Sequence, residues 1–141
     1  MATSIRCASC EKPVRGRKLF ELLRNLAVHT PDPCRFCSKD LKLCLKFPFG
    51  LGASHNESTV LDVFAPQHRE SWKHGKATTE FWPFLVVLRR HERSKAIWFP
   101  YWHLDKEGGK TKTKYGQWAP FMDSHLFEDL LRQARERGHD F

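Results

Sequence analysis

Cys7-Ala8-Ser9-Cys10 and Cys34-Arg35-Phe36-Cys37 set the organisation of the N-terminal part of this chain. Each stretch places two cysteines three residues apart, and 23 residues separate the two pairs. Two thiolates on one tight turn can bind the same ion, and a second such turn completes a shell of four sulfur atoms. The spacing therefore predicts a metal centre built from Cys7, Cys10, Cys34 and Cys37.

The chemistry of four thiolates favours Zn²⁺ as a structural cofactor, because the ion is borderline-soft, has no redox chemistry and prefers a tetrahedral shell. An iron–sulfur cluster can use the same four ligands, so that alternative stays open. A redox Cys-x-x-Cys pair would follow a strand in a βαβ unit, and no strand pattern precedes Cys7. Disulfides would need an oxidising compartment, and the first residues show no secretory signal. We therefore expect an intracellular, reducing location such as the cytoplasm.

The two Cys-x-x-Cys knuckles resemble those of zinc-ribbon and treble-clef proteins, over about the first forty residues. A zinc ribbon normally has a β-hairpin between its knuckles, whereas the periodicity here predicts a helix from Arg17 to Val28. Pro31 and Pro33 then end the helix and lead into the second knuckle. The apolar positions at helical spacing are Leu19, Phe20, Leu22, Leu23 and Leu26.

The remainder of the chain reads as strands followed by one helix. We expect strands over 41–49, 60–64, 81–90, 95–103 and 115–121. The runs 81–90 and 95–103 form a hairpin in this interpretation, and Pro83 and Pro100 mark edges or points where pairing stops. Residues 65–79 read as a long loop or an irregular helix, and a C-terminal helix begins at Asp123 or Ser124. We find no internal repeat.

These elements predict an α+β fold. A zinc-stapled module of residues 1–40, with four cysteines on two knuckles around a helix, lies on a mixed or antiparallel sheet of about four to five strands in residues 41–141. A chain of 141 residues is long enough for one core, so we expect one compact unit. No apolar run approaches the roughly 20 residues that span a bilayer, and no membrane partner is expected.

The charge of the chain is concentrated near the cysteines. The net charge is +8, and the first fifty residues hold ten Lys or Arg against four Asp or Glu, a net of +6. Phosphates are attracted to a basic metal-stapled module whatever the base sequence, although a solubilising surface explains the same charge. Our first hypothesis is a small non-enzymatic zinc protein that binds nucleic acid or a complex containing it. The candidate phosphate contacts are Arg15, Arg17, Lys18, Arg35 and Lys39.

Two other functions stay open. One is a protein-interaction adaptor or regulator in which exposed aromatic residues such as Trp72 or Trp118 dock a partner. The other is a metal-dependent nuclease that uses Asp62 with Glu70 or Glu92, although the acid-x-lysine spacing of restriction-type sites is absent. Cys44 shares the polar side of the strand 41–49 and is expected to be a free thiol.

Further basic and aromatic residues near the C-terminus are candidate contacts for a nucleic acid, although core packing and solvated loops are the commoner roles of such residues. These are Lys106, Lys110, Lys112 and Lys114, followed by Tyr115 and Trp118, and the aromatic run Trp98, Phe99, Tyr101 and Trp102.

Overall fold

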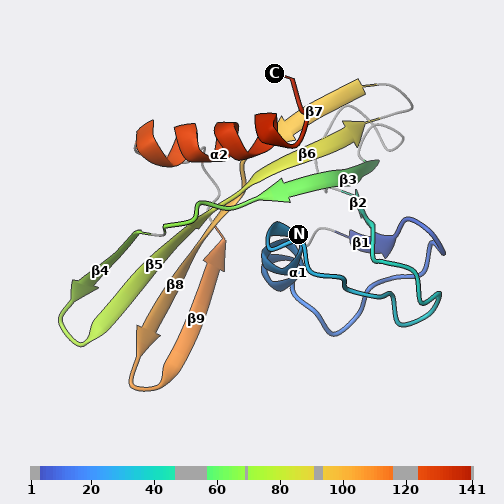
Figure 1. Ribbon diagram of the computed structural model, residues 1–141. Coiled ribbons are helices and arrows are strands. Elements are labelled where there is room, and N and C mark those ends of the chain that lie inside the picture. Colours follow the sequence, from blue (N-terminus) through green and yellow to red (C-terminus); the bar gives the residue numbers. More distant parts are fainter. Residues whose placement is uncertain (1–3, 47–56, 69, 91–93, 116–123, 141) are drawn as a thin grey trace. The chain divides into compact units, whose positions relative to one another are not determined.

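The computed structural model describes residues 4–46, 57–68, 70–90, 94–115 and 124–140. These residues form nine strands and two helices (Figure 1). The elements are β1 (Ser4–Cys7), α1 (Leu19–Ala27), β2 (Leu43–Lys46), β3 (Glu57–Phe64), β4 (Glu70–His74), β5 (Ala77–Pro83), β6 (Leu85–Arg90), β7 (Ser94–Trp98), β8 (Tyr101–Glu107), β9 (Lys110–Tyr115) and α2 (Ser124–Glu136).

The chain divides into two compact units. The first comprises residues 1–63 and 86–98, and the second comprises residues 64–85 and 99–141. A five-stranded sheet with the order β1-β2-β3-β6-β7 belongs to the first unit, and a four-stranded sheet with the order β4-β5-β8-β9 belongs to the second. The predicted α+β class and C-terminal helix are confirmed, but the expectation of a single sheet is wrong. The boundary expected at residue 40, between the metal module and the rest of the chain, stays a prediction.

Strand β2 shows the alternation that predicted it. Leu43 and Leu45 are fully buried, while Cys44 is half-buried and Lys46 is exposed. The strand pairs antiparallel with β1, so that Cys7 lies opposite Leu43, and antiparallel with β3 on its other side. Strand β1 leads into Cys7, where no strand was expected, but its antiparallel pairing is not that of the βαβ unit in which a redox Cys-x-x-Cys pair stands. The predicted strand continued to Phe49, and its part beyond Lys46 lies outside the described residues.

Helix α1 lies within the range predicted for it. Phe20, Leu22 and Leu23 are buried, whereas Glu21 and Arg24 are exposed. Just beyond the helix, the ring nitrogen Nε2 of His29 lies 3.1 Å from a carboxylate oxygen of Asp62 in β3. This polar contact therefore joins the end of the α1 segment to β3 of the first unit.

Pro83 and Pro100 stand where the chain leaves one sheet for the other. Pro83 is the last residue of β5 and Leu85 begins β6, while β7 ends at Trp98 and β8 begins at Tyr101. Proline has no N–H to donate to a ladder, so pairing stops there, as predicted. Each long predicted strand is therefore two strands that belong to different sheets. The hairpin itself is confirmed for β6 and β7, which pair antiparallel.

The second unit contains two antiparallel hairpins, β4–β5 and β8–β9 (Figure 1). The turn between β8 and β9 has Gly108 and Gly109 at φ +56° and +78°, the combination that a two-residue type I′ turn requires. The predicted loop over 65–79 is wrong, because it contains β4 and the start of β5. Four of the five β4 residues are exposed, so this strand lacks the apolar alternation that would have revealed it.

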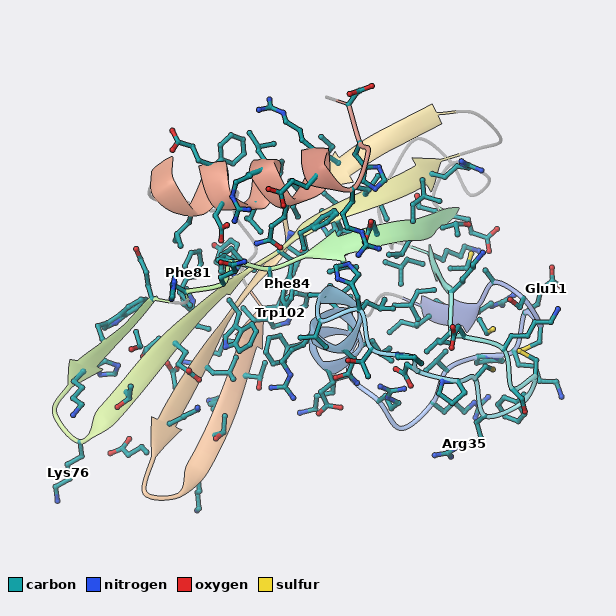
Figure 2. The ribbon with its side chains drawn as sticks, viewed as in Figure 1. Glu11, Arg35, Lys76, Phe81, Phe84 and Trp102 are labelled. Carbon is teal, nitrogen blue, oxygen red and sulfur yellow. The ribbon has the colours of Figure 1, made fainter. Side chains whose placement is uncertain are left out.

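Side chains on the second sheet pack or pair with one another. Trp102 is buried and contacts Phe84 edge-on, with ring centroids 5.6 Å apart (Figure 2). Lys106 forms an ion pair with Glu80 at 2.6 Å, and Lys114 forms one with Asp105 at 3.1 Å. These lysines and aromatic residues were candidate contacts for a nucleic acid. Trp102 is instead part of the core.

Helix α2 buries Leu126, Leu130 and Ala134, as its spacing predicts. It ends in a Schellman motif, in which Gly138 adopts φ +86° and the N–H of His139 donates to the carbonyl of Ala134. Of the strand predicted over 115–121, only Tyr115 lies in β9, and residues 116–121 are outside the described ranges. Among the helices of the described ranges, none has the length and apolar character needed to cross a bilayer.

We predict that Leu23→Ala lowers the free energy of unfolding by about 2–5 kcal/mol, because it leaves a cavity at a fully buried position of α1. Val28→Ala, at the end of the same helix, is the matched control. Val28 is 66% exposed, so its truncation is expected to change stability by no more than about 0.5 kcal/mol. Denaturant unfolding measures both. Equal losses in the two variants would contradict the packing of α1 described above.

Candidate metal centre

The structure brings the sulfur atoms of all four predicted cysteines together. The four Sγ atoms lie within 4.8 Å of one another. The Sγ atoms of Cys7 and Cys37 are 3.9 Å apart, and those of Cys10 and Cys34 are 3.7 Å apart. A tetrahedron of sulfur atoms around one ion, with metal–sulfur bonds of about 2.3 Å, has edges of about 3.8 Å. The site therefore has the dimensions of a single tetrahedral ion.

Disulfides and an iron–sulfur cluster fit these sulfur–sulfur distances poorly. All four cysteines are free thiols, and the sulfur separations are well beyond the roughly 2.05 Å of a disulfide. A cluster of two or four iron atoms is larger than one ion, so its cysteine ligands would stand farther apart than the edges of a one-ion tetrahedron. The donor set and its size thus fit one thiophilic metal ion.

The first loop is held by the backbone around Cys7. The Cys7 N–H donates to the carbonyl of Lys12 at 3.0 Å, and the Glu11 N–H donates to the carbonyl of Cys7 at 2.7 Å. Glu11 adopts φ +63°, the left-handed conformation that turns the chain back on itself. This reversal directs Cys7, at the end of β1, and Cys10, on the turn, toward the same point.

The second loop repeats the first. The Cys34 N–H donates to the carbonyl of Lys39 at 2.8 Å, and the Ser38 N–H donates to the carbonyl of Cys34 at 3.0 Å. Ser38 adopts φ +62°, matching Glu11 at the equivalent position. Each loop is closed by a single antiparallel bridge, which joins Arg6 to Pro13 and Pro33 to Asp40.

The correspondence covers ten residues, 5–14 and 32–41, at an offset of 27. The outermost hydrogen bonds also match, since the Val14 N–H donates to Ile5 and the Leu41 N–H donates to Asp32. The absence of an internal repeat, expected from the sequence, is therefore wrong at the level of structure. Only the pattern Cys-x-x-Cys-x-Lys is shared between the two loops, which is too little to reveal the repeat without the backbone.

The backbone of each loop also acts on the thiols. The N–H groups of Cys37 and Phe36 lower the pKa of Cys34 to about 6, because both stabilise its thiolate. The Lys12 N–H has the same effect on Cys10, but burial and the neighbouring sulfur atoms outweigh it and raise the pKa of Cys10 to about 11. In the metal-free protein, the four thiols therefore ionise unevenly, because their sulfur atoms are too close together to be charged at the same time. A bound cation would remove this repulsion.

An ion pair links the segment before α1 to the second loop. The guanidinium of Arg17 donates two hydrogen bonds to the carboxylate of Asp32, at 3.0 and 2.8 Å. These bonds raise the pKa of Arg17 above its ordinary value. Two-pronged pairs of this kind are among the stronger charged contacts in proteins, and this one fixes the approach to Cys34.

Cys44 lies outside the centre. It occupies the middle of β2, opposite Arg6 of β1, and it is not among the four clustered sulfur atoms. Burial is the main reason that its pKa is raised, so the thiol form is favoured. The structure thus places Cys44 among the free thiols, as expected.

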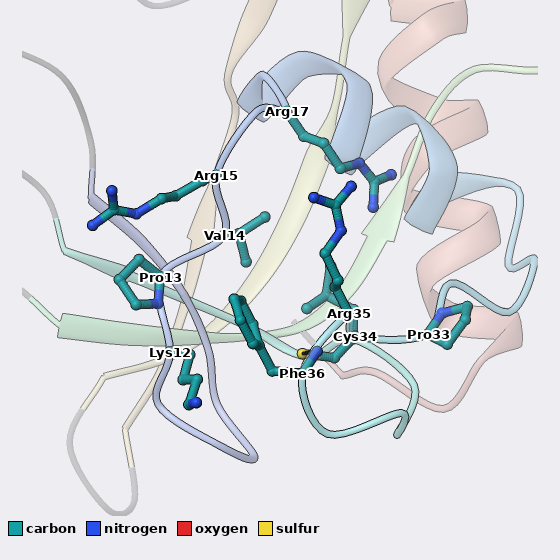
Figure 3. Close-up of a pocket in the computed structure, with 10 residues that line it drawn as sticks. Lys12, Pro13, Val14, Arg15, Arg17, Pro33, Cys34, Arg35 and Phe36 are labelled. Carbon is teal, nitrogen blue, oxygen red and sulfur yellow. Dashed lines mark hydrogen bonds between the residues drawn. The ribbon is translucent and has the colours of Figure 1, made fainter.

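The predicted phosphate contacts lie on the two loops and between them. Arg15, Lys18, Arg35 and Lys39 are exposed, while Arg17 is held by Asp32. Arg15, Arg17 and Arg35 line a common groove (Figure 3), and Lys18 and Lys39 are not among its lining residues. Lys12 and Phe36, which were not among the predicted contacts, line the same groove and contact each other across the two loops.

The acidic residues offered for a nuclease do not form a cluster with three ligands. In the part of the chain that the structure describes, the four cysteines are the only group of three or more His, Cys, Asp or Glu residues placed to hold a metal ion. Asp62 instead contacts His29 and accepts a hydrogen bond from the Val63 N–H at 3.0 Å. Glu92 and Trp118 lie outside the described residues. Compared with known families, curated proteins and solved structures, the chain matches none.

We predict that the purified protein carries about one metal ion per chain and that Cys34→Ser loses both the ion and much of its thermal stability, because three sulfur atoms leave the tetrahedron open. Cys44→Ser is the matched control and is expected to retain the ion. Elemental analysis with thermal unfolding measures both properties. Metal-free wild-type protein that stays folded, or equal losses in the two variants, would contradict a metal centre at these four residues.

Metal affinity is expected to rise between about pH 7 and pH 9. The pKa of Cys10 is raised to about 11, so its proton must leave before the sulfur can bind, and this becomes easier as the pH increases. Competition with a chromogenic chelator at several pH values gives the affinity, and Cys44→Ser should show the same slope. An affinity independent of pH would show that the four thiols are already ionised in the metal-free protein.

Proposed function

We propose that this chain is a small non-enzymatic protein in which Cys7, Cys10, Cys34 and Cys37 hold a structural Zn²⁺ ion, and whose basic metal module binds nucleic acid. The observation that carries the metal assignment is the convergence of four sulfur atoms at the spacing of a one-ion tetrahedron. Four protein ligands fill the coordination shell of Zn²⁺, so the ion stabilises the fold and has no position at which to activate a substrate.

The nucleic-acid proposal is supported by where the charges stand on the module. Lys12 and Lys39 occupy the same position of the two repeated loops, two residues after the second cysteine, and both are exposed. Arg15 and Arg35 are exposed as well and line one groove. Exposed cations gain from neutralising phosphates, whatever the base sequence.

Arg17 has a different place in this proposal. Its guanidinium is engaged by Asp32, and the pair leaves little net charge for a phosphate. Removing Arg17 would also expose the carboxylate of Asp32 beside the second loop. We therefore assign Arg17 to the architecture of the groove and rest phosphate binding on Arg15, Arg35 and the two loop lysines. A reducing compartment is part of the proposal, because it keeps the four thiols available to the metal.

We predict that replacing Arg15 and Arg35 together by alanine weakens binding to nucleic acid and lowers the slope of log affinity against log salt by about 1.4–1.8, since each lost phosphate contact is worth about 0.7–0.9. The charge-matched control is Lys73→Ala with Lys112→Ala, two exposed lysines of the second unit. Fluorescence anisotropy at several salt concentrations measures the slope. The control is expected to keep the wild-type slope.

Two outcomes would contradict the nucleic-acid proposal. One is binding that does not depend on salt, and the other is a slope that Arg15→Ala with Arg35→Ala leaves unchanged. A salt-tolerant protein partner lost in Trp72→Ala would favour the adaptor function instead, because Trp72 is 45% exposed on β4.

A further inference from the structure

A groove of about 300 Å³ lies over the two metal-binding loops. Figure 3 shows the ring of Phe36 in its middle, with Pro13 on one side and Arg35 on the other. Among the ten lining residues that the structure describes, four are cationic and none is acidic. The cations are Lys12, Arg15, Arg17 and Arg35.

Phe36 is 58% exposed, so its ring gains little from burial. The Nζ atom of Lys12 lies 4.9 Å from the centre of the ring, a cation–π contact between the two loops. The groove thus combines an aromatic ring that is largely exposed with a positive charge over one face of that ring. This is the pair of features that a nucleotide, with its flat base and its charged phosphate, would match.

A comparison of the two repeated loops shows which residues the loop conformation does not require. Arg35 and Phe36 occupy the positions that Ala8 and Ser9 occupy in the first loop. Both loops have the same backbone hydrogen bonds and the same left-handed residue after the second cysteine. A loop with Ala and Ser therefore also adopts this conformation, so neither the arginine nor the exposed phenylalanine is needed to form it.

We infer that the groove binds single-stranded nucleic acid, with one base stacked on Phe36 and the flanking phosphates against Arg15 and Arg35. This inference rests on the proposed nucleic-acid function and specifies its substrate. Bases within a duplex already have both faces covered by their neighbours, so only an unpaired base offers a free face to the ring. A volume of about 300 Å³ is at the lower end of ligand pockets, which is the size range of a single nucleotide.

Charge complementarity favours nucleic acid over an acidic peptide. In a nucleic acid, each negative charge is accompanied by a flat ring, and the groove offers a ring in contact with Lys12, with Arg15 and Arg35 also among the lining residues. In an acidic peptide, the carboxylates match the arginines, but they bring no group that covers the exposed face of Phe36. Phe36 is therefore the residue whose replacement distinguishes the two partners.

The test compares the metal-loaded full chain with Phe36→Ser, which places at position 36 the residue that the first loop has at its equivalent position. The probes are a fluorescent single strand of about 12 nucleotides and the duplex of the same sequence. We expect the wild type to prefer the single strand. Phe36→Ser is expected to bind the single strand about tenfold more weakly or worse, while its salt slope and its metal content stay those of the wild type.

Two controls accompany this variant. Phe36→Trp keeps an aromatic face and is expected to keep the affinity for the single strand. Trp72→Ser removes an exposed aromatic residue from the second unit and is expected to leave both affinities unchanged.

The outcomes separate this inference from the function on which it rests. If wild type and Phe36→Ser bind single strand and duplex equally well, with salt dependence, the stacking site is overturned and the proposed function stands. If neither probe binds in a salt-dependent way, both are overturned. If polyglutamate competes as well as the single strand, and its binding also depends on Phe36, the partner is an acidic peptide and the single-strand inference is overturned.

Discussion

The convergence of four sulfur atoms within 4.8 Å is the constraint on which the N-terminal part of this protein depends. The two loops that carry the sulfur atoms are mostly exposed, and each is closed by only a few backbone hydrogen bonds. Such loops bury too little apolar surface to hold one another in place. Four ionised thiols at this spacing would also repel each other. A bound cation would remove the repulsion and would join residues 7–10 to residues 34–37, on either side of α1.

Local pattern was sufficient for the features that depend on neighbouring residues. Cysteine spacing located the centre, a period of 3.6 located α1, and alternation located β2. What it did not supply is which strands pair and in which sheet. Pro83 and Pro100 correctly marked interrupted pairing, but only the three-dimensional pairing shows that the chain changes sheets there. Strand β4 was not predicted because four of its five residues are exposed, so its sequence shows no alternation between a buried and an exposed face.

The groove has a signal in the sequence that can be read only once the backbone has shown the two cysteine loops to be equivalent. Aligning the two cysteine loops shows Arg35 and Phe36 in the places of Ala8 and Ser9, a difference that the shared backbone makes informative. The partnership of Arg17 with Asp32 was not accessible in the same way, because 15 residues separate them and the contact depends on how α1 is placed. A count of charges along the sequence treats Arg17 and Arg35 alike. The structure shows that Arg17 is already paired with Asp32.

The interleaving of the two units has a consequence for how the protein is made. Both cysteine loops are complete once residue 41 has been synthesised. Strands β6 and β7, which belong to the same sheet as β1 and β2, are complete only at residue 98, where β7 ends. At about 5–20 residues per second, the ribosome takes roughly 3 to 11 seconds to cover that distance. All four thiols thus emerge well before the sheet can close. A metal ion bound by these four thiols would therefore join the two cysteine loops before β6 and β7 pair with the rest of the sheet.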